Sequence, residues 1–353
     1  MNMDQKIEKN TSNKIKWVNF IGCIMIIMLH STKYKYFVVS SACKKILDYI
    51  TLYFPEAGVP MFFMLSGFLM YKDVANSKEM ISQQYERKLK SRLKSLLIPF
   101  YIFNIWGMLL TILEQSIPFI NNHINSAIRF NYSVSDVLDG ILLFKFNGVA
   151  WYIFCLIIYV FFFPVIARLS KKTWIIVFII CTALSCLNYP EGWLVGYLGQ
   201  YNSIFFYVLG AYIAMYHFAW INIKFSKRQT YIAMVMLLIV VGIIGITPRE
   251  FKIALMFLRT TELLCVWICC DALRQFPVPN CALITFFAYM MHSELQKCIN
   301  KIFAIVLPNR GDVFAIINTF GGVIFTYLII FVLSILLRKY FRKIWNIING
   351  GRA

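Results

Sequence analysis

Two histidines stand in long apolar stretches of this chain, where an ionisable side chain has no water to solvate it. His30 closes the apolar run 17–29, and His292 lies within the apolar stretch 281–305. An ionisable residue inside a membrane span is by default a candidate for function. An imidazole gains and loses protons near neutral pH, so it suits a general base. The simpler alternative is a packed ring that is hydrogen-bonded to a neighbouring carbonyl.

Helix geometry predicts that the two histidines lie at a similar depth. His30 lies about 13 residues, or roughly 20 Å, beyond the start of its expected span. His292 lies about 11 residues, or roughly 16 Å, into a later span that runs in the same direction. This spacing predicts one polar cavity that both imidazoles face, and it makes both residues candidates for catalysis.

The elements that must position these residues are membrane-spanning helices. The chain is 60% hydrophobic and only 14% charged. Apolar stretches of about 20 residues, the length that crosses a bilayer, recur along its whole length. The period-two alternation of a membrane β-barrel is absent from the sequence. We therefore expect an all-α fold, a polytopic bundle of about ten transmembrane helices.

The ten expected spans follow from the apolar stretches. They cover about 17–36, 49–71, 96–115, 149–167, 174–189, 203–219, 230–247, 252–271, 281–305 and 313–337. The apolar segment 136–146 is too short to cross and is expected to re-enter the membrane or to lie on its surface.

The distribution of Lys and Arg predicts the orientation. Basic residues are concentrated in the N-terminal segment 1–16, the loop 72–95 and the tail 338–353, so both termini are expected in the cytoplasm. The chain 1–353 is expected to form a single domain in the cytoplasmic (inner) membrane. Membrane lipids are the expected partners of its basic surface, because anionic headgroups account for the net charge of +19 without any nucleic acid. No cluster of residues has the spacing of a metal site.

Charged residues in two other spans are candidate ligands of a substrate. Arg259 and Glu262 are three residues apart on one expected helix, so they can form an ion pair or contact an acceptor or donor. Glu56 is expected near the outer face, where a sugar acceptor can meet it. Ser66, beside Gly67, removes side-chain bulk, which allows either a neighbouring helix or a ligand to approach the backbone.

Several motifs, taken together, are similar to those of one family. The chain resembles the membrane-bound acyltransferase 3 family, which O-acylates bacterial surface polysaccharides and lipid-linked sugars. The motifs are His30, VPMFFMLSGF at 59–68, the basic stretch 88–94 followed by LLIPFY at 96–101, Trp151 and Tyr152 leading to Pro164, FYVLG at 206–210, and FAYMMHS at 287–293.

The resemblance implies acetyl-CoA as the acyl donor, entering from the cytoplasm. Its phosphates require arginine or lysine at the inner mouth of the bundle. Arg92 matches the family pattern, and Lys88 and Lys94 flank it, although basic residues also mark an ordinary cytoplasmic loop. Trp151, together with Glu56, Ser66, Arg259 and Glu262, is a candidate contact of the acceptor.

The chain departs from the family pattern at five positions where charged or basic residues are usual. Family members usually have arginine at the positions of Asn19, Glu56 and Ser95, aspartate at Lys16, and histidine at Val149. The fold therefore transfers more directly than the chemistry.

The function expected from the sequence is O-acyl transfer, with acetyl the expected group. The acyl group moves from acyl-CoA to a hydroxyl of a cell-surface glycan or of its lipid-linked precursor. Two alternatives stay open. A transporter or flippase of polysaccharide building blocks also needs polar residues in mid-membrane, although no internal repeat is evident. The second alternative is a family member that has lost catalysis and has a binding role.

Overall fold

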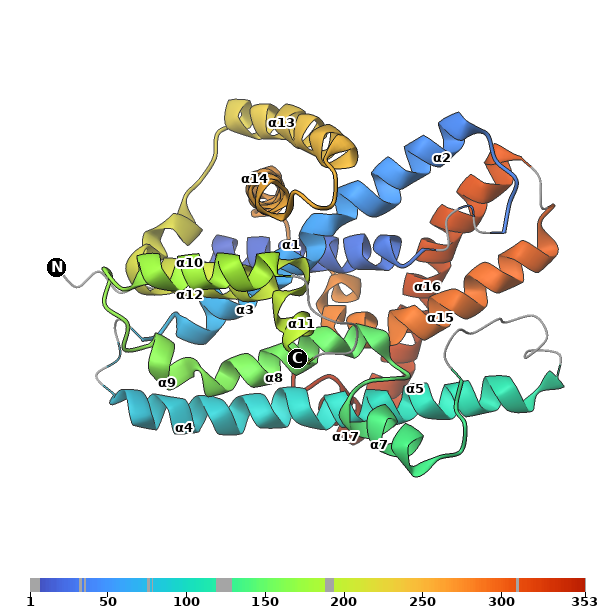
Figure 1. Cartoon of the computed structure of the whole chain (residues 1–353), viewed down its shortest axis with the longest axis horizontal. Helices are drawn as coiled ribbons and strands as arrows, with labels where there is room; N and C mark the ends of the chain where they lie inside the picture. Colours follow the sequence, from blue (N-terminus) through green and yellow to red (C-terminus); the bar gives the residue numbers. More distant parts are fainter. Residues whose placement is uncertain are drawn as a thin grey trace. The chain divides into compact units, whose positions relative to one another are not determined.

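Helices are the only regular elements that the computed structural model contains among the residues it describes (Figure 1). Those residues are 7–31, 34, 36–74, 77, 79–118, 129–187, 194–308 and 311–352. The predicted all-helical fold is confirmed. The helices group into two compact units that alternate along the chain. Unit 1 comprises Met1–Ile26, Leu52–Leu89 and Tyr159–Leu283, and unit 2 comprises Ile27–Thr51, Lys90–Ile158 and Ile284–Ala353. The single domain 1–353 stays a prediction.

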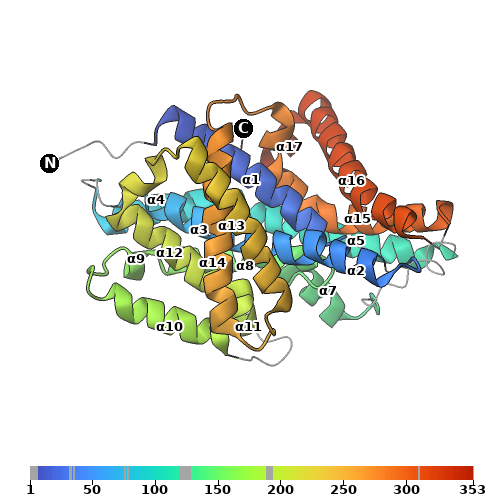
Figure 2. The same ribbon diagram turned by 90° about the horizontal axis from the view of Figure 1, so that it is seen from above.

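Unit 1 is built mainly on a central helix pair and a second, antiparallel pair. Its helices are most of α1 (Lys9–Leu29), α3 (Gly58–Tyr71), most of α4 (Ile81–Arg92), α9 (Phe163–Ile166), α10 (Trp174–Cys186), α11 (Leu194–Gly199), α12 (Ser203–Tyr216), α13 (Lys227–Ile246) and α14 (Lys252–Cys269). Helix α3 packs on α12, and α13 packs on α14 (Figure 2). The short turns η2 (Phe54–Ala57) and η7 (Cys270–Leu273) carry acidic residues of the unit.

Unit 2 contains the two long helices of the C-terminal region, α15 and α16. Its helices are α2 (Ser41–Asp48), α5 (Ile98–Ser116), α7 (Val134–Leu142), most of α8 (Trp151–Phe161), α15 (Thr285–Val306), α16 (Asp312–Tyr340) and α17 (Arg342–Ile348). Helices α15 and α16 lie side by side (Figure 1). A π-helical turn, η3 (Leu93–Leu97), joins α4 to α5 without a break, and such wide turns often occur at functional sites.

Membrane-crossing capacity is evident for six helical segments of the described chain. They are Lys9–Leu29, Ser41–Tyr71, Ile81–Ser116, Lys227–Ile246, Lys252–Leu273 and Asp312–Tyr340. Three shorter apolar helices, Gly148–Phe161, Trp174–Cys186 and Ser203–Tyr216, and the less apolar α15 occupy the other expected ranges. The chain is therefore a helical membrane protein, while the count of ten spans and the cytoplasmic placement of both termini stay predictions.

Helix α1 is displaced toward the N-terminus relative to its expected range. It begins at Lys9 and ends at Leu29, so His30 follows the helix instead of lying within it. The early start has a physical cause. Lys14 lies in the first turns and is fully buried, with an ion pair to Asp271 of η7 at 2.9 Å. Hydropathy alone places a lysine such as Lys14 outside a membrane span. It cannot take account of Asp271, the partner that lies far away in the sequence.

Two glycines allow α3 and α12 to touch backbone to backbone. A Cβ added to Gly67 would lie 2.0 Å from the carbonyl oxygen of Tyr207, and one added to Gly210 would lie 1.9 Å from that of Met64. Neither position has room for a side chain. Gly67 therefore serves helix packing, one of the two roles that the sequence left open for the small pair, while the substrate role of Ser66 stays a prediction.

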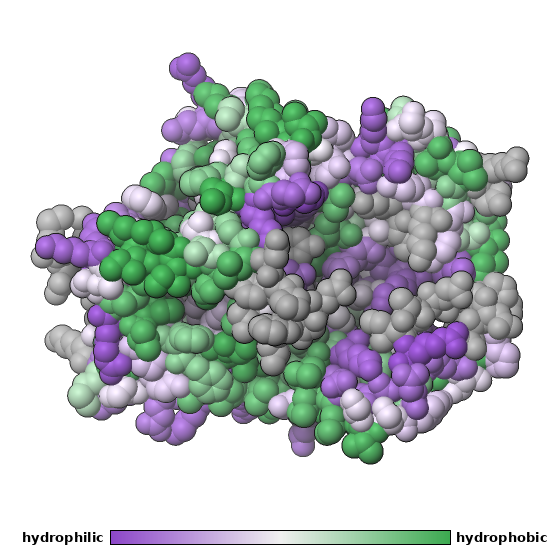
Figure 3. Space-filling model, viewed as in Figure 1, coloured by the Kyte–Doolittle hydropathy of each residue, from purple (hydrophilic) through white to green (hydrophobic). Residues whose placement is uncertain are grey.

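The outward face of unit 1 is apolar where lipid is expected. Four isoleucines of α10 are exposed, and the surface over α10 is broadly hydrophobic (Figure 3). They are Ile175, Ile176, Ile179 and Ile180. An exposed apolar helix face of this kind suits contact with acyl chains.

Candidate active site

The structure brings the two predicted histidines together in unit 2. The ring centroids of His30 and His292 are 5.1 Å apart, with the ring planes inclined at 56°. His30, just after α1, is exposed, whereas His292, in the second turn of α15, is fully buried. The pair thus joins a residue that keeps exposed surface to one that is fully enclosed.

Hydrogen bonding fixes the tautomer of His292. Its Nδ1 lies 2.6 Å from the carbonyl oxygen of Tyr289, which can only accept, so Nδ1–H is the donor. Nε2 then carries the lone pair, and it has no hydrogen-bond partner among the described residues. Tyr289 is itself held in place because its hydroxyl donates to the carbonyl oxygen of Val149 at 2.6 Å. A buried, oriented lone pair therefore points away from the α15 backbone, in the neighbourhood of His30.

Charged groups of unit 2 surround this pair. Lys297, one turn beyond His292, forms an ion pair with Glu294 at 2.7 Å, and its charge acts on both imidazoles. Glu114 of α5 lies 3.9 Å from the sulfur of Cys298 on the same stretch of α15. Among the described residues, α15 therefore carries the charged side chains of Glu294 and Lys297 within two turns of His292.

A second polar cluster lies in unit 1, centred on Glu56. This carboxylate is 3% exposed and accepts hydrogen bonds from Arg259 Nε at 3.2 Å and Nη2 at 3.0 Å. Its other oxygen pairs with Arg249 Nη1 at 2.7 Å. Arg259 also donates to Asn202 Oδ1 at 3.0 Å. Glu56 thus stands between two guanidinium groups that come from one end of α14 and from its middle.

Of the two alternatives that the sequence left open for Arg259 and Glu262, the structure does not contain the ion pair between them. Glu262 is fully buried, and neither of its carboxylate oxygens has a hydrogen-bond partner within the described chain. Arg259 reaches Glu56 instead, on an element about 200 residues away in the sequence. Helical spacing permits an i,i+3 pair but does not require it, and the better-placed carboxylate takes the guanidinium.

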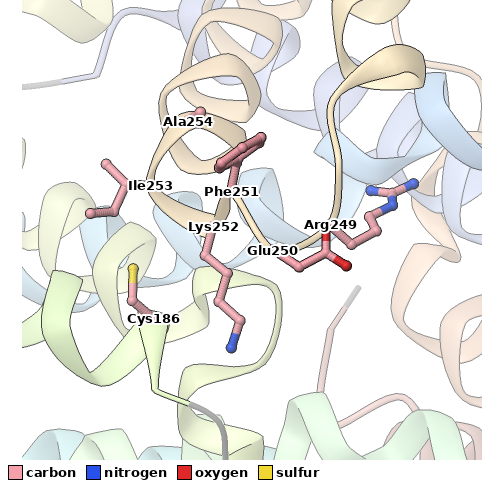
Figure 4. Close-up of a pocket in the computed structure, with 7 residues that line it drawn as sticks. All are labelled: Cys186, Arg249, Glu250, Phe251, Lys252, Ile253 and Ala254. Carbon is pink, nitrogen blue, oxygen red and sulfur yellow. The ribbon is translucent and has the colours of Figure 1, made fainter.

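A cavity of about 730 Å³ opens at the N-terminal end of α14 in the same unit (Figure 4). Its lining consists of Cys186 from α10 and the continuous segment 249–254. Arg249 belongs both to this lining and to the Glu56 cluster, so it links the cavity to the buried carboxylate. The sequence reasoning missed Arg249 and Asn202, because no local pattern sets either apart from an ordinary loop residue.

The remaining predicted residues are less concentrated. Ser66 is partly buried on α3, and Trp151, 9% exposed, begins α8 in unit 2. Of the basic trio, Lys88 belongs to unit 1, where it is buried and pairs with Asp73 at 3.3 Å. Arg92 and Lys94 belong to unit 2, at the end of α4 and in η3. The three basic residues are therefore divided between the units, and Lys88 already has a carboxylate partner.

A known protein family matches most of the chain. The signature of the acyltransferase domain of this class covers residues 13–339, a range that includes both histidines, Arg92 and the Glu56 cluster. The chain belongs to the acyltransferase 3 family. It is therefore a membrane acyltransferase. The family resemblance seen in the sequence is confirmed. No curated protein and no solved structure matches the chain.

Proposed function

We propose that the chain transfers an acyl group, most simply acetyl, from acyl-CoA to a hydroxyl of a cell-surface glycan or a lipid-linked sugar in the cytoplasmic membrane. The observation that carries this proposal is the histidine pair, in which an exposed imidazole lies 5.1 Å, centroid to centroid, from an enclosed one of fixed tautomer. Family membership supplies the class of reaction, and the pair supplies the base that the reaction needs.

The two histidines have different roles in this reaction. His30, which is exposed, acts as the general base on the acceptor hydroxyl. His292 is a positioning residue, because its free Nε2 lone pair can accept the ring N–H of His30. The structure does not contain this bond; once formed, it leaves the other nitrogen of His30 unprotonated and able to act on the substrate. A base oriented by a third group is the arrangement of the hydrolytic triads, here with an imidazole in place of the carboxylate.

Each bond change in the transfer has a named group. The acceptor oxygen forms a bond to the thioester carbonyl carbon while its proton passes to His30. The carbonyl oxygen becomes an oxyanion, and Lys297, five residues after His292 on α15, is the cation proposed to stabilise it. The carbon–sulfur bond then breaks, and the protonated His30 returns the proton to the thiolate of CoA. The histidine ends in its starting state, so no further acid or base is required.

Acceptor recognition is assigned to the polar residues that the sequence singled out. Glu56, with Arg259 as its partner, offers charged groups to the hydroxyls of a sugar, and Arg249 extends this cluster to the cavity at the start of α14. Ser66 and Glu262 are the other proposed acceptor contacts within unit 1, and Trp151 is the proposed acceptor contact within unit 2. The buried carboxyl of Glu262 has both oxygens free to bond an acceptor hydroxyl.

The test is the acylation of surface glycans in cells that carry defined variants. Deleting the gene should remove one acyl group from the surface glycan, measured by mass spectrometry, and the wild-type gene should restore it. His30→Ala should lower restoration by roughly 10²–10⁴-fold, the usual contribution of a general base.

His217 provides the matched control. This histidine bonds Tyr212 and stacks on Trp220 in unit 1, so His217→Ala should restore acylation fully. Full acylation by a normally expressed His30→Ala protein would overturn the general-base role. Loss of the whole polymer on deletion, in place of loss of its acyl group, would overturn acyl transfer to that polymer.

A further inference from the structure

The C-terminal turn of the chain is docked on the π-helical turn η3. Arg352 Nη1 donates to the carbonyl oxygens of Ser95 and Asn349, each at 3.2 Å. Gly350 and Gly351 have φ of 63° and 69°, which favours glycine. A Cβ on Gly350 would lie 2.3 Å from the Ser95 oxygen. Backbone conformation and close contact together therefore fix where the Arg352 guanidinium lies.

This guanidinium is enclosed on several sides within unit 2. It lies 3.8 Å over the ring of Phe286, at the start of α15. Arg92 precedes Ser95 by about one helical turn, and the Ser95 hydroxyl donates to the Arg92 carbonyl at 3.4 Å. Burial, together with the charge of Arg92, lowers the pKa of Arg352 to about 10. The Arg352 guanidinium is thus held against the helical turn that begins with Arg92.

Neither guanidinium forms an ion pair with a carboxylate that the structure describes. Like charges held together without a counter-ion repel each other, and burial increases the cost. A phosphate relieves both effects, because two planar guanidinium forks match its oxygens with charge-assisted hydrogen bonds.

The region is connected to the histidine pair by successive contacts of aromatic rings. Arg352 lies over the ring of Phe286, which precedes Tyr289 by three residues on α15. The Tyr289 ring lies 5.7 Å from His292, which is next to His30. A donor whose phosphates lie apart from its reactive thioester, as in acyl-CoA, suits such an arrangement of cations at one end and a base at the other.

We propose that Arg92 and Arg352 together bind a phosphate of the acyl-CoA donor, with the C-terminal turn supplying one of the two cations. This inference rests on the proposed function, since it names the site of that donor. Arg352 lies beyond residue 339, where the match to the family ends, so the site includes a residue from outside the family domain. It replaces in space the second arginine that the family pattern places at Ser95.

The test measures binding of free CoA to the purified full-length protein in an uncharged detergent, by isothermal titration calorimetry. Wild type should bind CoA, and Arg352→Gln should raise Kd by about 10- to 100-fold, as loss of a charge-assisted phosphate contact predicts. Lys343→Gln, which removes an exposed cation from α17 of the same tail, is the matched control and should leave Kd unchanged.

Arg92→Gln keeps the inference testable if Arg352→Gln fails to fold. It should weaken CoA binding as well, and the double variant should be little worse than either single one, because both side chains hold the same phosphate. Fully additive effects would overturn the shared site.

Two further outcomes separate this inference from the proposed function. Wild-type protein that binds no CoA would overturn the proposed donor and, with it, this site. If wild type binds CoA and Arg352→Gln binds it with the same Kd, only the inference about Arg352 is overturned. Phosphatidylglycerol added to the micelles distinguishes the other source of phosphate. If this lipid displaces CoA from wild type but not from Arg352→Gln, the pair is a headgroup site and the donor assignment fails.

Discussion

Asp271 is the acidic centre of a buried charge network in unit 1, and neutralising it should destabilise the protein strongly. Its Oδ1 accepts from Lys14 at 2.9 Å and from Arg274 at 3.1 Å, and its Oδ2 accepts the Phe225 N–H at 3.0 Å. The side chains of Lys14 and Asp271 are 0% and 6% exposed, so solvent screens the pair very little. Asp271→Asn keeps the shape but leaves a buried lysine without its counter-ion. Breaking a buried pair in this way costs about 3–5 kcal/mol.

The assay is reversible unfolding of the purified protein in mixed micelles, followed by circular dichroism. Lys14→Met in the Asp271→Asn background should recover the part of the loss that Lys14 causes, because no uncompensated lysine charge stays buried and Arg274 keeps its pair with Glu8 at 3.7 Å. Lys224→Met is the control: it removes an exposed pair to Glu8 at 3.9 Å, which is worth at most about 1 kcal/mol. If Asp271→Asn costs no more than Lys224→Met, or if Lys14→Met rescues nothing, the reasoning from burial fails.

Two more predictions follow from particular contacts. Gly67→Ala or Gly210→Ala should destabilise by about 1–3 kcal/mol in the same unfolding assay, because each Cβ meets a backbone carbonyl, whereas Gly242→Ala, with open space at its Cβ, should be neutral or stabilising. Hydrogen bonds from Lys145 and from the Asn131 N–H hold the pKa of Asp136 below its usual range. Its stabilisation of the α7 segment should therefore be complete above the ordinary aspartate pKa and be lost as pH falls below it. Hydrogen exchange of 129–147 should reveal that loss in wild type, whereas Asp136→Asn should show no such pH dependence, and equal pH dependence in both proteins would contradict it.

Helix positions were predictable wherever lipid contact alone determines them. The exposed apolar faces of α10 and α13 belong to ranges that hydropathy had placed within a few residues. Burial against lipid depends only on local composition, so the sequence contains the whole signal. Helix α1 began earlier than expected because Lys14 has a partner in η7, and no local pattern records a contact over that separation.

The residues of the candidate site were predictable only where local composition sets them apart. His30 and His292 stood out because an ionisable group in an apolar stretch is costly wherever it lies. Glu56 and Arg259 stood out too, but their pairing did not, since Glu262 was the nearer carboxylate in sequence. Arg352 gave no signal at all. A lone arginine in a basic tail has the appearance of an ordinary cytoplasmic flank, and only the turn that folds it against Ser95 distinguishes it.

The missing family arginines take on a different meaning in this light. Asn19 and Ser95 remove two cations from the positions where the family usually has them. Ser95 belongs to unit 2, and within that unit Arg352 lies against Ser95 itself and brings a cation to the same turn. Transfer of an acyl group requires positive charge at the oxyanion and at the donor phosphates, and it is indifferent to which element supplies that charge. The loss of a family arginine from the sequence is therefore evidence of lost activity only when no other cation in the folded structure lies where that arginine would act.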